Sequence, residues 1–148
     1  MTRTLAALAA ALLIPAATAA ALCASTALAT AQSYPGDAGA GVERGIEQRN
    51  NSGQVGTVTL FAHGRDALVF VRMHGASGAE PVRLFRGGDC DSLAAMPAFV
   101  VSDLRGGVSR SLVHATEDRL LSGNYNVVVF ASTAQHAGVA ACGHLYAR

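Results

Sequence analysis

The hydrophobic residues of this chain follow two different patterns. Residues 5–22 form an apolar run that only Pro15 and Thr18 interrupt, whereas from residue 53 onward short apolar stretches alternate with polar positions. Alternation with a period of two is typical of strands that bury one face. The sequence therefore predicts seven strands, at residues 55–61, 67–73, 81–85, 98–104, 108–115, 125–131 and 139–146.

Turn residues between these stretches predict two hairpins. His63-Gly64-Arg65-Asp66 separates the first two strands, and Arg105-Gly106-Gly107 separates the fourth from the fifth. Residues 116–118, Thr-Glu-Asp, are typical of a helix start, and the glycine at position 123 limits that helix to about one turn. Many short strands with little helix predict an all-β fold, an antiparallel sandwich or barrel.

The N-terminal apolar run has the form of a secretory signal peptide. Arg3 supplies a positive charge before the run, and small residues lead to a cleavage site between Ala31 and Gln32. Residues 1–31 are therefore expected to be removed on export to a periplasm or to the outside of the cell. No membrane insertion is expected after this processing.

Two alternatives to a cleaved signal peptide are less well supported. A retained anchor helix would have to accommodate Pro15 and the small-residue cleavage site. A lipoprotein would be processed before Cys23, but the preceding residue is Leu22, where a small residue is normally required.

The mature chain is divided into a tail and one domain. Residues 32–52 are rich in glycine and polar residues with little periodicity, which predicts a flexible N-terminal tail. Residues 53–148 then form a single β domain. Its charge is nearly balanced, since the whole chain has 11 basic and 10 acidic residues, and there is no tryptophan. These values argue against a nucleic-acid partner.

Two cysteines, Cys90 and Cys142, remain after residue 31. In an oxidising compartment they have only one intramolecular pairing, so a disulfide is expected. Closing a loop of about 52 residues would stabilise the fold by about 4 kcal/mol on the chain-entropy estimate. A reactive thiol or a metal-binding pair is the alternative.

Three segments resemble the copper–zinc superoxide dismutase family and its shorter bacterial periplasmic relatives. They are residues 53–58 at the first hairpin, residues 83–90, which end in Gly-Asp-Cys, and residues 138–143, which include Ala-Cys-Gly. The likeness covers about residues 53–146. It implies a Greek-key β-sandwich in which Cys90 and Cys142 pair with each other.

The same resemblance argues against the family's reaction. Its copper-binding histidines fall at Arg83, Phe85 and Phe130, and a shift of one residue places the first two at Leu84 and Arg86. Neither register supplies a histidine, whereas copper and zinc need imidazole or carboxylate ligands at fixed geometry. An arginine would repel a cation, and phenylalanine would fill the site with apolar volume.

Other parts of the family's active site are also missing. Val139 stands where the catalytic arginine would be, and the loops that would hold the zinc ligands and guide the substrate are too short. The sequence therefore predicts no catalytic residue, no metal and no cofactor.

The five histidines match no compact metal motif. They are His63, His74, His114, His136 and His144. We expect independent histidines at the surface or at strand edges. A regrouped metal site is the alternative, because sandwiches bring distant strand ends together.

The sequence thus predicts an exported, non-catalytic β-sandwich that acts as a binding or structural module. Its partner would be an envelope or extracellular component, or a second copy of the chain in a homodimer. The alternative is a copper- or zinc-binding, or superoxide-dismuting, protein with a rearranged metal site.

Overall fold

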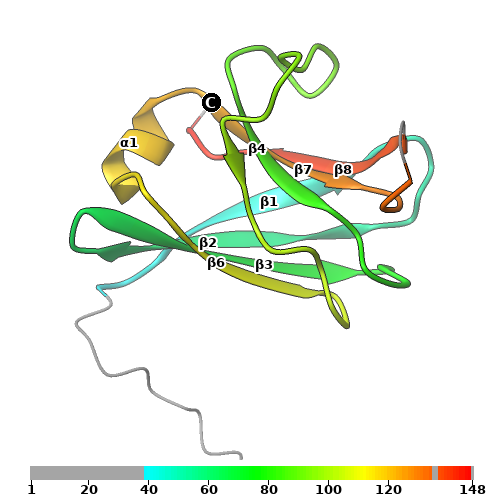
Figure 1. Ribbon diagram of the computed structural model, residues 1–148, viewed down its shortest axis with the longest axis horizontal. Helices are drawn as coiled ribbons and strands as arrows, with labels where there is room; N and C mark the ends of the chain where they lie inside the picture. The colour runs from blue at the N-terminus through cyan, green and yellow to red at the C-terminus, as the bar shows by residue number, and fades with distance from the viewer. Residues whose placement is uncertain (1–38, 135–136, 148) are drawn as a thin grey trace, which may run out of the picture. The chain divides into compact units, whose positions relative to one another are not determined.

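Figure 1 shows the computed structural model, which describes residues 39–134 and 137–147. The predicted signal peptide, its cleavage site at Ala31 and Gln32, and His136 lie outside the described residues. Among the described residues, no helix has the length and apolar character needed to cross a membrane.

Within the described ranges the chain forms eight strands and one short helix. They are β1 (Val42–Gln48), β2 (Val55–His63), β3 (Asp66–His74), β4 (Val82–Arg86), β5 (Phe99–Val100), β6 (Val108–Val113), α1 (Glu117–Ser122), β7 (Tyr125–Phe130) and β8 (Val139–His144). The strands follow the order β5-β4-β7-β8-β1-β2-β3-β6, and every pair is antiparallel. The predicted all-β antiparallel sandwich or barrel is confirmed.

Strand β1 joins two sheets that lie face to face (Figure 1). Residues 42–46 pair with β2, whereas Glu47 and Gln48 pair with Cys142 and Ala141 of β8. At this junction the backbones approach closely, because a Cβ atom on Gly143 would collide with the carbonyl of Gly45. The result is a nearly closed sandwich whose two edges are β5 and β6.

The main core lies between the two sheets and follows the period-two pattern. Val58 and Leu60 of β2, Val69 and Val71 of β3, and Leu84 of β4 are at most 1% exposed. Neighbouring residues on β2 and β3 are partly exposed. The alternation seen in the sequence therefore corresponds to a buried and a partly exposed face of each strand.

The first hairpin and the short helix are confirmed. β2 and β3 are joined by a two-residue turn in which Gly64 has a φ of 63°, a left-handed conformation that suits glycine. α1 is six residues long, and the backbone N–H of Arg119 donates to the Thr116 hydroxyl at 3.2 Å. Thr116 is thus the N-cap that the sequence predicts.

The second predicted hairpin is wrong. Residues 98–104 and 108–115 form no strand ladder with each other, because β5 pairs with β4 and β6 pairs with β3. Only the turn itself is retained, as a bridge between Arg105 and Val108. The chain passes from one sheet to the other here, since Leu104 is buried in the core and its N–H donates to the Glu80 carbonyl at 2.8 Å.

The prediction that all of residues 32–52 form a flexible tail is also wrong, because β1 lies within them. Ile46 is the one fully buried residue of this strand, so hydrophobic alternation is weak. Backbone pairing to β2 and β8 holds it instead. The domain therefore begins before residue 53.

Candidate functional site

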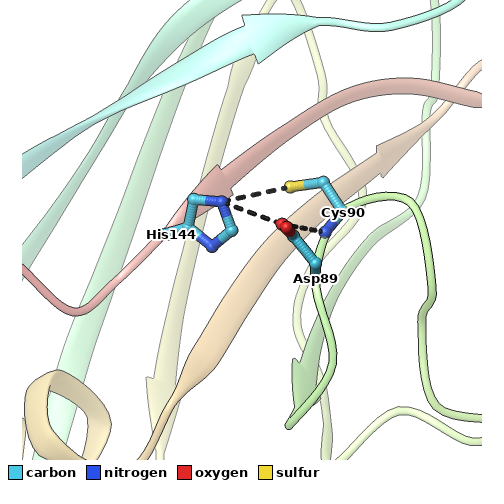
Figure 2. Close-up of side chains that lie close together, drawn as sticks. All are labelled: Asp89, Cys90 and His144. Atoms are coloured by element: carbon cyan, nitrogen blue, oxygen red, sulfur yellow. Dashed lines mark hydrogen bonds and ion pairs between the residues drawn. The ribbon is translucent and has the colours of Figure 1, made fainter. Parts of the chain in front are cut away.

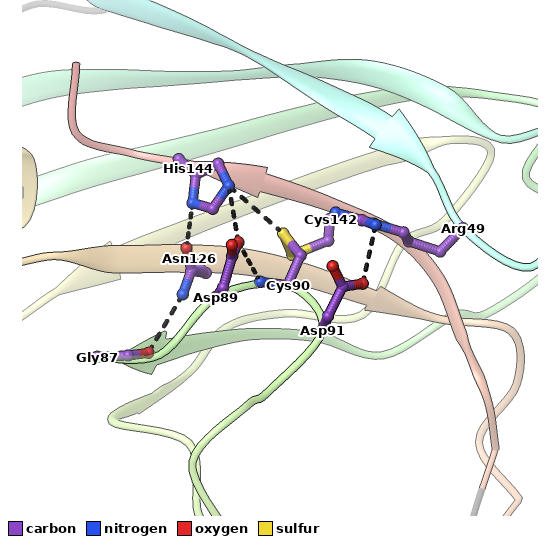
Figure 3. Close-up of a disulfide and its surroundings, with 8 residues drawn as sticks. All are labelled: Arg49, Gly87, Asp89, Cys90, Asp91, Asn126, Cys142 and His144. Atoms are coloured by element: carbon purple, nitrogen blue, oxygen red, sulfur yellow. Dashed lines mark hydrogen bonds and ion pairs between the residues drawn. A yellow bond between two sulfur atoms is a disulfide. The ribbon is translucent and has the colours of Figure 1, made fainter. Parts of the chain in front are cut away.

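A disulfide between Cys90 and Cys142 fastens a loop across the outer face of one sheet (Figure 3). Cys142 lies in β8, and Cys90 lies in the loop of residues 87–98, between β4 and β5. The two cysteines are 7% and 2% exposed. Next to the disulfide, Arg49 holds the loop through an ion pair of 3.0 Å with Asp91. The disulfide expected from the sequence is confirmed.

Beneath this loop lies a second group of buried residues, which we call the outer cluster. Its members come from β4, β7, β8 and the loop, and they are Phe85, Cys90, Val128 and Cys142, with Leu93, Phe130 and Val139 packed against them. They alternate along the strands with residues of the main core, such as Leu84, Val127 and Val129. The sheet β4-β7-β8 is thus covered on both faces.

The three positions to which the resemblance assigns copper ligands lie in two different surroundings. Phe85 and Phe130 lie together in the outer cluster, with ring centroids 6.3 Å apart. The Nη1 atom of Arg83 lies 3.1 Å from an Asp103 carboxylate oxygen and 3.2 Å from the Val101 carbonyl. The structure thus brings the two phenylalanines together and engages the arginine elsewhere.

At the rim of the outer cluster, His144 lies among polar groups (Figure 2). Its Nε2 atom is 3.2 Å from Oδ1 of Asp89 and 4.0 Å from Sγ of Cys90. Its Nδ1 atom is 2.6 Å from Oδ1 of Asn126, which stands directly opposite His144 in the β7–β8 ladder. The His144 side chain is only 16% exposed.

The orientation of Asn126 determines which ring nitrogen faces the loop. Asn126 is fully buried, and its Nδ2 group donates to the Gly87 carbonyl at 3.3 Å. Its Oδ1 atom therefore faces His144 and accepts a hydrogen bond from Nδ1–H. Nε2 of His144 then points at the Asp89 carboxylate. Two acceptors this close need a positive charge between them, which a proton or a metal ion can supply.

Asp89, Cys90 and His144 also meet the geometric requirement for a shared metal ion. Their ligand atoms all lie within 4.8 Å of one another. In the disulfide, however, the Cys90 sulfur is not a thiolate, the form that binds metals. The oxidised protein therefore offers a carboxylate and an imidazole here.

Sequence reasoning missed this group because it treated His144 as an independent histidine. Two signals in the sequence point to it. Cys142 and His144 are two residues apart, so on a strand they share a face, and Asp89 directly precedes Cys90. The disulfide brings these two segments together.

The other described histidines agree with the surface prediction. His63 and His74 are exposed at the ends of β2 and β3. His114 is 87% exposed, and its Nδ1 atom lies 3.1 Å from Oδ1 of Asp66. These residues lie on the other sheet and do not join the His144 group.

No protein-family model matches the chain, no curated protein matches it, and no solved structure matches it.

Proposed function

We propose that the mature chain is an exported, non-catalytic β-sandwich of the copper–zinc superoxide dismutase type, acting as a binding or structural module. The observation that carries this is the contact between Phe85 and Phe130 in the outer cluster. The resemblance assigns copper ligands to both positions. Two apolar rings that fill the space between β4, β7 and the disulfide loop cannot coordinate copper.

The connections between strands support a Greek-key arrangement. β3 pairs with β6, and β4 pairs with β7, so the chain crosses between the sheets rather than passing from neighbour to neighbour. Such crossings are common in Greek-key sandwiches. The pairing of Cys90 with Cys142 is also the one that the resemblance implies.

The disulfide supports export. A buried disulfide is consistent with an oxidising compartment, which agrees with a signal peptide at residues 1–31. In that compartment we propose an envelope or extracellular partner, or a second copy of the chain. The edge strands β5 and β6 carry three exposed apolar residues, Val100, Val108 and Leu112. These are the first residues to mutate in a search for the surface that binds a partner.

The test is the metal content of residues 32–148, isolated from the exported fraction with the disulfide intact and without chelator. We expect neither copper nor zinc in stoichiometric amount, and no visible d–d bands after copper is added. Stoichiometric copper, or superoxide decay that depends on it, would overturn the proposal.

A gain-of-function variant tests the assignment of the ligand positions. The triple change Arg83→His, Phe85→His and Phe130→His is expected to raise the affinity for Cu²⁺ above that of the parent. The matched control is Arg83→Gln, Phe85→Leu and Phe130→Leu, which alters the same positions without adding a ligand. Equal affinity in both triple variants would contradict the assignment.

A second candidate function is metal handling at a rearranged site, and the proximity of Asp89 and His144 favours it. If this is correct, metal bound by the oxidised protein should be lost in His144→Gln. The variant His114→Gln should retain that metal, because His114 lies on the other sheet.

A further inference from the structure

We propose that Cys90 and Cys142, which form a disulfide in the oxidised protein, become zinc ligands when they are reduced. Reduction would free the Cys90 thiolate to bind Zn²⁺ together with Asp89 and His144, and the Cys142 thiolate would supply the fourth ligand. This proposal goes beyond the function proposed above and does not rest on it, since that function concerns the oxidised protein.

The distances between donor atoms are close to those of a tetrahedral zinc site. With zinc–ligand distances of about 2.0–2.3 Å, neighbouring donor atoms lie about 3.4–3.8 Å apart. The Nε2 atom of His144 is 3.2 Å from the Asp89 carboxylate and 4.0 Å from the Cys90 sulfur. All three ligand atoms lie within 4.8 Å of one another, so side-chain shifts of about 1 Å or less would place a zinc ion among them.

His144 is already held in the form that zinc binds. Histidines that bind metal through one nitrogen usually donate the other N–H to a fixed acceptor. Here that acceptor is Oδ1 of Asn126, 2.6 Å from Nδ1, and the buried amide is oriented by its bond to the Gly87 carbonyl. Nε2 therefore points toward Asp89 and Cys90, where a metal ion would take the place of the proton between Nε2 and the carboxylate.

The positions of the two cysteines provide the remaining ligands. Cys142 and His144 lie on the same face of β8, and Cys90 follows Asp89 in the loop (Figure 3). The Cys142 sulfur is not in the group whose ligand atoms all lie within 4.8 Å of one another, so its side chain has to turn toward the ion once the bond to Cys90 is broken. Two thiolates, an imidazole and a carboxylate complete a four-coordinate site.

The chemistry balances with an external dithiol as reductant. The dithiol supplies two electrons and two protons, so the S–S bond breaks, two thiols form, and the dithiol becomes a disulfide. Zn²⁺ then displaces the two thiol protons and the proton shared by His144 Nε2 and Asp89, which pass to solvent, and the metal is not itself reduced or oxidised. Reoxidation by a disulfide oxidant would reverse these steps and release the metal.

The first experiment compares oxidised and reduced residues 32–148 without oxygen, using a non-chelating phosphine as the reductant and Co²⁺ as the probe. We expect the reduced protein to bind one equivalent with a sulfur-to-cobalt charge-transfer band and intense tetrahedral d–d bands. Displacement of Co²⁺ by Zn²⁺ then gives the zinc affinity. The oxidised protein should show no such bands, and binding that is equal in both states would overturn the proposal.

Matched variants separate this site from nonspecific binding by thiols. His144→Gln and Asp89→Asn are each expected to weaken zinc binding by the reduced protein by at least about 10-fold. His114→Gln and Asp66→Asn change a histidine–aspartate pair of similar geometry on the other sheet and should leave zinc affinity unchanged. Cys90→Ser and Cys142→Ser each leave one thiolate ligand, so each should bind Co²⁺ with lower affinity and show a weaker sulfur-to-cobalt band than the parent.

The same variants distinguish a folded zinc site from metal binding by a reduced chain that has unfolded. An unfolded chain would bind metal through its cysteines, so all four histidine and aspartate variants would bind as the parent does. That result would overturn the proposal. As a second measurement, Zn²⁺ should raise the melting temperature of the reduced parent, but not that of the oxidised parent or of reduced His144→Gln.

Discussion

The main core and the outer cluster lie on opposite faces of the same strands, yet they are built differently. The inner face of β4, β7 and β8 is almost entirely aliphatic, and it packs against the other sheet. The outer face carries two aromatic rings and a disulfide, with a polar rim at Asp89, Asn126 and His144. The inner face therefore stabilises the fold by apolar contact between the sheets, whereas the outer face combines a covalent bond with polar groups that could bind a ligand.

The two faces also differ in what holds them together. Inner residues are fixed by strand ladders and by a complete layer of neighbours. The outer cluster is covered by residues 87–98, a loop in which Asp89 and Ser92 form an isolated bridge and Cys90 is covalently tied to β8. The outer face should therefore open under changes that leave the inner face intact.

Removal of the disulfide is expected to have the largest effect on the outer face. The double variant Cys90→Ala with Cys142→Ala should lower the free energy of unfolding by about 4 kcal/mol, because the unfolded chain regains a long closed loop. Urea unfolding of the oxidised parent and of the variant measures this difference. An unchanged free energy of unfolding would mean that the loop is held by other contacts.

Neighbouring residues on β4 permit a direct comparison of the two faces. Leu84 is fully buried in the main core, and Phe85 is 6% exposed in the outer cluster. Leu84→Ala should lower the free energy of unfolding by about 4 kcal/mol, because the inner layer cannot collapse around the cavity. Phe85→Ala should lower it less, by about 3 kcal/mol, because the loop can move inward.

Calorimetric melting and limited proteolysis distinguish these two variants. Leu84→Ala should lower the melting temperature more, whereas Phe85→Ala should increase cleavage within residues 87–98. If Phe85→Ala lowers the melting temperature more, the outer cluster is the more rigid of the two.

The inner face was largely predictable, because its pattern is local. Period-two alternation identified strands such as β2 and β3, and turn residues identified the hairpin at Gly64. β1 was missed because it is held by backbone pairing and buries only Ile46 fully. The partners of β5 and β6 were missed because a local turn does not show that the chain crosses between sheets.

The outer face was only partly predictable, because its contacts join distant segments. Cysteine counting identified the disulfide, and the resemblance singled out Phe85 and Phe130, which do meet. The group around His144 depends on the pairing of Asn126 with His144 across β7 and β8, and on the position of Asp89. Local spacing places Asp89 beside Cys90 and His144 on the face of Cys142, but it does not show that Asn126 pairs with His144.

A substitution at Asn126 tests how much the polar side chains at the rim of the outer cluster stabilise the outer face. It is fully buried and bonds to His144 and to the Gly87 carbonyl. Leucine at position 126 has a similar volume to asparagine but makes neither hydrogen bond. Asn126→Leu should therefore lower the free energy of unfolding by about 2 kcal/mol. Hydrogen exchange should show faster opening near Gly87 than in β2. A uniform change across both sheets would contradict a local role for Asn126.

The smallest effect is expected for the exposed histidine–aspartate pair on the other sheet. The side chain of His114 is 87% exposed, whereas that of His144 is 16% exposed, although their nearest carboxylate contacts are 3.1 and 3.2 Å. Water screens the exposed pair, so His114→Gln should change the free energy of unfolding by less than about 0.5 kcal/mol. His144→Gln should lower it more, because it disrupts the hydrogen bond of the buried Asn126 amide. Urea unfolding at low and high salt measures both variants. Equal effects would mean that distance, rather than burial on the outer face, determines the strength of these pairs.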